Sequence, residues 1–202
     1  MRLRRARYSL ERQKRKNNIG MPRQKAIIIG VTASIAIYKA CDIVRRLKEE
    51  AFSVSVVMTQ EAGALISPVV FQSLSQNKVY RGLFDSPDAW EIEHVSLAEK
   101  ADLVLVAPAT ANIIGKIASG ICDDLLTCII CATKAPVLIS PAMNENMYKN
   151  KITQANIGKL KALGYRFIEP KKGRLACGRV GLGCLAEVED IIKEARKIIN
   201  GR

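Results

Sequence analysis

The sequence predicts an α/β fold of three layers, in which helices cover both faces of a mostly parallel β-sheet. Two observations predict this fold class. Short apolar runs typical of buried strands recur along the chain, and segments with apolar residues at helical spacing lie between them. Strands that alternate with helices pair in parallel, because each helix carries the chain back across the sheet.

The elements follow one another from residue 25 onward. The run KAIIIG (25–30) ends in a glycine, and residues 34–50 then place Ile37, Val44 and Leu47 on one face of a helix. SVSVVMT (53–59) completes a βαβ unit. The whole arrangement is Rossmann-like. Further buried strands are expected at 102–110 and 135–143, and further helices at 111–120, 122–133, 151–163 and 187–199.

Length and charge divide the chain into two parts. Residues 1–22 form a basic tail, since eight Arg and Lys within the first twenty residues stand against the single acid Glu11. Such a tail is expected to be disordered. Residues 23–202 form one domain, for which a hydrophobic content of 49% supplies a large core. Much of the net charge of +13 sits in the tail, so we do not expect a nucleic-acid partner.

Composition also bears on the compartment. No apolar run reaches the length of about 18 residues that a membrane span requires, and the tail lacks the apolar stretch of a signal peptide. The six cysteines do not form a disulfide framework in a chain of this length, so a cytoplasmic protein is expected. Cys128 and Cys131 form a CxxC in an apolar helix, where we expect buried core thiols, and Asp123 and Asp124 are expected to cap that helix.

Small and polar residues follow four predicted strands, at the edge where parallel sheets bind ligands. The turn GVTASIA (30–36) has amides and hydroxyls that suit a phosphate, although Thr32 or Ser34 could simply cap the helix. It lacks the GxGxxG spacing of dinucleotide sites, so a mononucleotide is favoured. The candidate binding residues are Thr32, Ala33, Ser34, Thr59, Ala109, Thr110, Ala111, Asn112, Ala142, Met143 and Asn144.

Three side chains offer more specific chemistry. Asn112 and Asn144 present amide donors and acceptors suited to ring carbonyls or a carboxylate, with helix capping as the alternative. His94 is the sole histidine and precedes a helix and strand that lead to the same edge. It could move protons near neutrality, with a structural role at a helix start as the alternative. One histidine and scattered cysteines do not supply a metal ligand set.

The segment RLACGRVGLGC (174–184) holds three glycines and two cysteines. Glycines let a loop turn sharply and lie close against a ligand. The sequence therefore predicts a flexible lid that carries the Cys177 thiol, with a plain glycine-rich connection as the alternative.

Five motifs together give the chain a family resemblance over residues 25–190. GVTASIAIYK, the histidine of EHV, APATANIIGKIASGICDDLL, PAMNENMY and ACGRVGLG resemble the homo-oligomeric flavin-containing cysteine decarboxylases. They are most similar to the branch that acts on 4′-phosphopantothenoylcysteine in coenzyme A biosynthesis. The resemblance implies FMN as cofactor, held by Thr32, Ala33, Ser34, Thr59 and residues 109–112. It also implies His94 as the active-site histidine, Asn144 beside Ala142 and Met143 as the carboxylate-binding residue, and Cys177 as a proton donor on the lid.

The chemistry implied by the resemblance agrees with these residue types. A carboxylate beside an amide nitrogen cannot lose CO2 until an electron sink exists, and oxidation of the substrate's cysteine side chain to a thioaldehyde creates one. Loss of CO2 then gives an enethiolate, and return of the two electrons gives 4′-phosphopantetheine. His94 would act in the oxidative half and Cys177 in the reductive half. The alternatives are a relative that decarboxylates the C-terminal cysteine of a peptide, and a non-catalytic flavoprotein that regulates a partner.

The resemblance also bears on assembly. Family members form trimers, or assemblies of trimers, with the flavin at the subunit interface, so we expect a homo-oligomer. Many relatives are fused to a phosphopantothenate–cysteine ligase domain. The chain is therefore expected to be either a stand-alone decarboxylase, with that ligase as a separate partner, or a fragment of a bifunctional protein. One departure is Cys184, which stands where relatives often carry Arg and so removes a positive charge from the lid.

Overall fold

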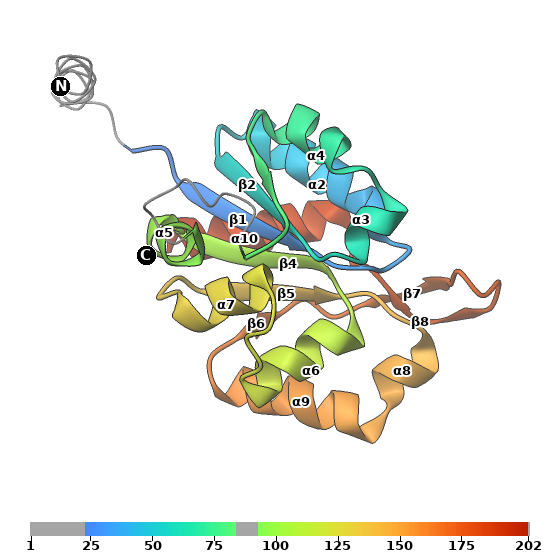
Figure 1. The fold of residues 1–202 in the computed structure, drawn as a ribbon. Coiled ribbons are helices and arrows are strands. Elements are labelled where there is room, and N and C mark those ends of the chain that lie inside the picture. Colours follow the sequence, from blue (N-terminus) through green and yellow to red (C-terminus); the bar gives the residue numbers. More distant parts are fainter. Residues whose placement is uncertain (1–22, 84–92, 202) are drawn as a thin grey trace, which may run out of the picture.

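The computed structural model describes residues 23–83 and 93–201 and confirms the predicted α/β fold. A six-stranded parallel sheet has the strand order β3-β2-β1-β4-β5-β6, and helices lie on both of its faces (Figure 1). The predicted basic tail, residues 1–22, lies outside the described residues. The strands are β1 (Ala26–Val31), β2 (Ser53–Met58), β3 (Val79–Tyr80), β4 (Leu103–Ala109), β5 (Val137–Pro141), β6 (Arg166–Phe167), β7 (Lys171–Arg174) and β8 (Val180–Cys184). The helices are α2 (Ile37–Glu49), α3 (Ala62–Leu65), α4 (Pro68–Ser75), α5 (Glu93–Lys100), α6 (Ala111–Ser119), α7 (Leu125–Ala132), α8 (Glu145–Lys149), α9 (Lys151–Ala162) and α10 (Val188–Asn200).

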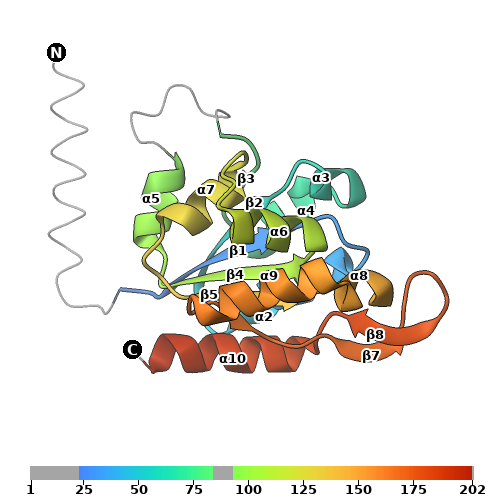
Figure 2. The ribbon, with the colours of Figure 1, turned by 90° about the horizontal axis from the view of Figure 1, so that it is seen from below.

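The alternating side chains of the strands divide the core into two halves. Ile27 and Ile29 of β1 pack on the face covered by α2, α4 and α10, whereas Ile28 packs on the face covered by α5, α6, α7 and α9. Figure 2 shows these helix layers on either side of the sheet. Every residue of β4 is buried, which is expected of a central parallel strand covered on both faces. The near-continuous apolar runs of the sequence follow from this double burial.

Capping contacts fix the helix boundaries. The Asp124 carboxylate accepts a hydrogen bond from Thr127 N at 2.8 Å and starts α7, which confirms its predicted capping role. Thr110 Oγ1 accepts from Ile113 N at 3.3 Å and starts α6. The first helix begins at Ile37, three residues later than predicted, because Ile37 N bonds to Ser34 O and residues 34–36 form a turn.

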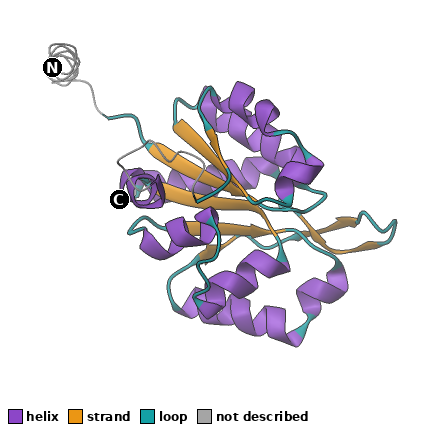
Figure 3. Ribbon diagram, in the orientation of Figure 1, coloured by secondary structure: helices purple, strands orange, loops and turns teal. Residues whose placement is uncertain are grey.

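Two regions differ from the prediction. Residues 60–83, to which the sequence assigned no elements, contain α3, α4 and β3. The predicted flexible lid is an antiparallel hairpin of β7 and β8, which extends beyond the sheet (Figure 3). Among the described helices, none is both long and apolar enough to cross a membrane.

The prediction that the CxxC thiols are buried is wrong. Cys128 is half-buried and Cys131 is exposed. The reason is helical periodicity, since Leu126, Ile129 and Ile130 occupy the side of α7 that faces the sheet.

Asp102 joins the starts of β1 and β4. Its carboxylate accepts a hydrogen bond from Ala26 N at 2.8 Å and pairs with Arg23 at 2.9 Å and Lys25 at 3.3 Å. Burial alone would raise the pKa of Asp102, but the hydrogen bond from Ala26 and the two cations together bring that pKa below its ordinary value. The ionised carboxylate therefore stabilises the folded state.

We expect Asp102→Asn to lower the free energy of unfolding by about 1 kcal/mol at neutral pH. Because the pKa is lowered on folding, the wild-type contribution is present above the unfolded pKa of about 3.9 and is lost as the pH falls through the folded value. Urea unfolding should therefore show that the free energy of unfolding falls more steeply between neutral and acidic pH for the wild type than for the variant. Identical pH dependence of the two proteins would contradict this role.

Candidate functional site

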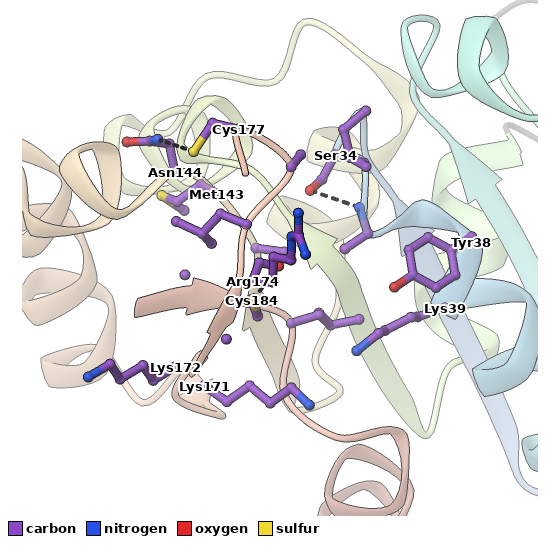
Figure 4. Close-up of a pocket in the computed structure, with 18 of the residues that line it drawn as sticks. Ser34, Tyr38, Lys39, Met143, Asn144, Lys171, Lys172, Arg174, Cys177 and Cys184 are labelled. Atoms are coloured by element: carbon purple, nitrogen blue, oxygen red, sulfur yellow. Dashed lines mark hydrogen bonds between the residues drawn. The ribbon is translucent and has the colours of Figure 1, made fainter. Parts of the chain in front are cut away.

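A pocket of about 820 Å³ opens at the carboxyl edge of the sheet (Figure 4). Its walls come from residues 34–39 after β1, residues 142–144 after β5, and the β7–β8 hairpin. The strand order changes direction beside β1, so the pocket lies near the point where open parallel sheets bind ligands. The pocket thus brings together segments that are far apart in the sequence.

Asn144 uses the two ends of its amide differently. Oδ1 accepts a hydrogen bond from Asn146 N at 2.8 Å and caps α8, while Nδ2 donates to the Cys177 Sγ at 3.8 Å. The capping interpretation of this residue is confirmed, and its Nδ2 is left directed at the thiol. Because the cap fixes the orientation of the amide, Nδ2 is directed toward the exposed thiol and the pocket.

β8 packs directly on the segment that carries this amide. Met143 N donates to Gly183 O at 3.0 Å, and Leu182 N donates to Glu145 Oε1 at 3.3 Å. Gly183 has a φ of 146°, and a Cβ there would lie 2.1 Å from Met143 O. A Cβ at Gly181 would lie 2.5 Å from Glu145 Oε2. Gly183 is therefore needed for the close approach of two backbone segments, whereas a Cβ at Gly181 would displace the end of the Glu145 side chain.

The far end of α8 is held by a buried tyrosine. The Tyr148 hydroxyl donates to the Glu169 carboxylate, which also accepts from Lys161 Nζ at 2.5 Å. Burial, followed by the neighbouring Glu169 carboxylate, raises the pKa of Tyr148. α8 is thus fixed at one end by β8 and at the other by the loop between β6 and β7.

Thr32 is buried and joins the ends of two strands. Its Oγ1 donates to Pro108 O at 2.7 Å and accepts from Thr110 N at 3.1 Å. The proton of the Thr32 hydroxyl is therefore donated to a backbone carbonyl of the protein itself. The groups of this turn that remain available to a ligand are the backbone amides and Ser34, which lines the pocket.

The other predicted binding residues lie along the same edge with different exposure. Thr59 Oγ1 accepts from Ala62 N at 3.3 Å, and Asn112 is exposed at the start of α6. Ala142 N donates to Ala109 O at 2.9 Å, which ties the end of β5 to that of β4. Ala33, Thr110 and Ala111 are half-buried. The predicted residues that line the pocket itself are Ser34, Ala142, Met143, Asn144 and Cys177.

His94 is not brought to this pocket within one chain. It is half-buried in the first turn of α5, a helix that packs against α7, and its neighbour Glu93 pairs with Lys78 at 2.5 Å. Figures 1 and 2 both place α5 at the opposite side of the molecule from the β7–β8 hairpin.

Sequence reasoning missed the basic side chains of the pocket. Lys39 lies on the first turn of α2, and Lys171 and Lys172 lie on β7. The run KKGR directly before the glycine-rich segment was the available signal, since cations beside a ligand loop favour an anionic ligand.

We expect Gly183→Ala to detach β8 from the segment after β5, because the added Cβ would overlap Met143 O. The free energy of unfolding should fall by about 2 kcal/mol or more. Trypsin should then cut faster after Arg174 and Arg179. Gly158→Ala is the control, since nothing lies within 4 Å of the added Cβ in α9 and the helix should be slightly stabilised. Unchanged cleavage of the Gly183 variant would show that the contact does not hold the hairpin.

Comparisons with known proteins identify the family of this chain. The Flavoprotein family model matches residues 15–200. The chain is 46% identical over 177 residues to the coenzyme A biosynthesis bifunctional protein CoaBC of Bacillus subtilis, covering 88% of this chain and 44% of that protein. It is 43% identical over 172 residues to the probable phosphopantothenoylcysteine decarboxylase of Streptococcus mutans, covering 84% and 96% of the two chains. The chain thus spans less than half the length of the bifunctional relatives.

Solved structures show the same similarity. A mutant PPC decarboxylase complexed with pantothenoylaminoethenethiol has a TM-score of 0.77 at 31% identity, with 86% of this chain and 97% of that chain covered. The FMN binding protein AtHal3 has a TM-score of 0.76 at 32% identity, with 89% and 99% covered. The family match extends over most of the sequence, and the fold agrees with it. The chain therefore belongs to the flavoprotein family.

Proposed function

We propose that this protein is an FMN-dependent decarboxylase that converts 4′-phosphopantothenoylcysteine into 4′-phosphopantetheine in coenzyme A biosynthesis. The observation that carries the proposal is the Asn144 amide, oriented by its capping bond and 3.8 Å from the Cys177 thiol in the pocket. The relatives named for coenzyme A biosynthesis and for this decarboxylation support the choice of substrate.

The carboxyl edge suits FMN. Thr32 holds the ends of β1 and β4 together, so the turn after β1 lies beside the start of α6. Small side chains at Ala33 and Ala111 leave room for a ring or a phosphate between these segments. Ala33, Ser34, Thr110, Ala111 and Asn112 would contact the cofactor, with Thr59 beside them and Ala109 beneath. Bound FMN would supply reversible two-electron chemistry at these residues, and the overall reaction would have no net redox change.

The residues of this chain have distinct roles in the proposed reaction. Asn144 Nδ2 donates a hydrogen bond to the substrate carboxylate and directs the breaking C–C bond, while Ala142 and Met143 shape the wall beside it. Cys177 Sγ gives its proton to the carbon that has lost CO2. The hairpin covers the reacting atoms and limits access of water. His94 acts as the acid–base group while the cysteine side chain of the substrate is oxidised.

The test is mass spectrometry of 4′-phosphopantothenoylcysteine incubated with the FMN-supplied protein. Loss of one CO2 supports the proposal. His94→Asn should retain FMN but release no CO2. Cys177→Ser should release CO2 and leave a product about 2 Da lighter than 4′-phosphopantetheine, because the final two hydrogens are not added. Full activity of either variant would refute its assigned role.

We also propose a homotrimer, or an assembly of trimers, in which His94 reaches the site from a neighbouring subunit. The separation of His94 from the pocket within one chain supports this arrangement. Mixed trimers of His94→Asn and Cys177→Ser chains should then regain activity, because some sites combine an intact His94 with an intact Cys177. At equal mixing about one quarter of the wild-type activity is expected. No recovery in trimers shown to be mixed would place both residues in one subunit.

A second candidate function is decarboxylation of a peptide's C-terminal cysteine. It is favoured by the structural similarity to SpaF, described as an FMN-dependent cysteine decarboxylase, with a TM-score of 0.77 at 29% identity and 88% of this chain covered. A peptide ending in cysteine, offered beside the small substrate, separates the two. A regulatory flavoprotein would decarboxylate neither. In the favoured case the protein acts in the cytoplasm, and a phosphopantothenate–cysteine ligase supplies its substrate.

A further inference from the structure

The pocket has a second chemical feature besides the Asn144 amide and the Cys177 thiol. Four cationic residues line it, with Lys39 contributed by α2 and Lys171, Lys172 and Arg174 by β7 (Figure 4). The described residues that line it include no Asp or Glu. An enclosed surface with charges of one sign attracts ligands of the opposite sign.

Most of these cations lack an acidic partner. Lys171 pairs with Glu187, whereas no carboxylate of the described residues lies within ion-pair distance of Lys39, Lys172 or Arg174. The pKa of Glu187 is lowered by Lys171 first and by Lys39 as well, so both ammonium groups lie near the same carboxylate. One carboxylate therefore faces two positive charges, and a bound anion would reduce the repulsion among the cations of the pocket.

The cations and the reacting groups lie at different ends of the pocket. In Figure 4, Cys177 and Asn144 lie at one side, Arg174 lies near the middle, and Lys39 and Lys171 lie at the opposite side. A substrate whose carboxylate contacts Asn144 would extend across Arg174 toward the two lysines. The lysine end of the pocket would therefore receive the part of the substrate that lies farthest from the substrate's reacting cysteine. An anionic group at that position would suit the lysines.

We propose that Arg174 and Lys39, assisted by Lys171, bind the terminal phosphate of the substrate and so select phosphorylated over unphosphorylated pantothenoylcysteine. This inference rests on the proposed function. A phosphate monoester is close to a dianion at neutral pH, and the planar guanidinium of Arg174 can donate two hydrogen bonds to it. Because Arg174 belongs to β7, phosphate binding also holds the hairpin over the pocket that contains Cys177.

The test compares two substrates and four proteins, which are the wild type and three variants. With 4′-phosphopantothenoylcysteine, Arg174→Gln and Lys39→Gln should each raise KM about tenfold or more, with kcat less affected, because a charged hydrogen bond is lost. With unphosphorylated pantothenoylcysteine, KM should be the same as for the wild type. Arg179→Gln is the matched control, since Arg179 belongs to the turn of the same hairpin but does not line the pocket. The decisive quantity is kcat/KM for the phosphorylated substrate divided by kcat/KM for the unphosphorylated one. If this ratio stays at the wild-type level in both pocket variants, the inference is overturned.

Calorimetry separates this inference from the proposed function. The FMN-supplied wild type should bind 4′-phosphopantetheine about tenfold or more tightly than pantetheine, and Arg174→Gln should remove most of that difference. This result does not depend on turnover. If the wild type decarboxylates neither substrate yet shows the charge-dependent binding, the proposed reaction fails and the anion subsite stands. Equal affinities of the wild type for the two compounds would refute the subsite even if decarboxylation occurs.

Discussion

The contact between β8 and the segment after β5 is the constraint on which the pocket depends. The hydrogen bond from Met143 N to Gly183 O fixes the hairpin against the sheet, and the absence of a Cβ at Gly183 permits it. This single approach sets the position of Cys177 relative to Asn144 and also places β7 along one wall. The Cys177 thiol, the Asn144 amide and the basic wall are therefore all positioned through this one contact.

The sequence predicts those features that depend on local pattern and burial. Strands covered on both faces must be apolar throughout, so β4 and β5 were recognisable from their residues alone. Asp124 signals a helix start because its carboxylate satisfies the backbone amide of Thr127. The ligand edge follows from the parallel topology, which placed Ser34 and Asn144 together, and both line the pocket that also includes Cys177.

The remaining features depend on contacts between distant residues. The glycines of β8 were interpreted as a sign of flexibility. In the structure they pack against residues about forty positions earlier in the chain. No local sequence pattern reveals such a contact. Thr32 was interpreted as a ligand-binding hydroxyl or a helix cap. Its hydroxyl instead joins the end of β1 to the end of the neighbouring strand β4. The two short elements β3 and α3 carry too few residues for periodicity to show.

Tyr148 has a consequence for how the protein responds to alkaline conditions. Because burial and Glu169 raise the pKa of Tyr148, its hydroxyl remains a donor well beyond neutrality, and the anchor of α8 does not titrate there. The tyrosine anchor at the far end of α8 thus persists under moderately alkaline conditions. A loss of activity at moderately alkaline pH should consequently not arise from breakage of this tyrosine contact.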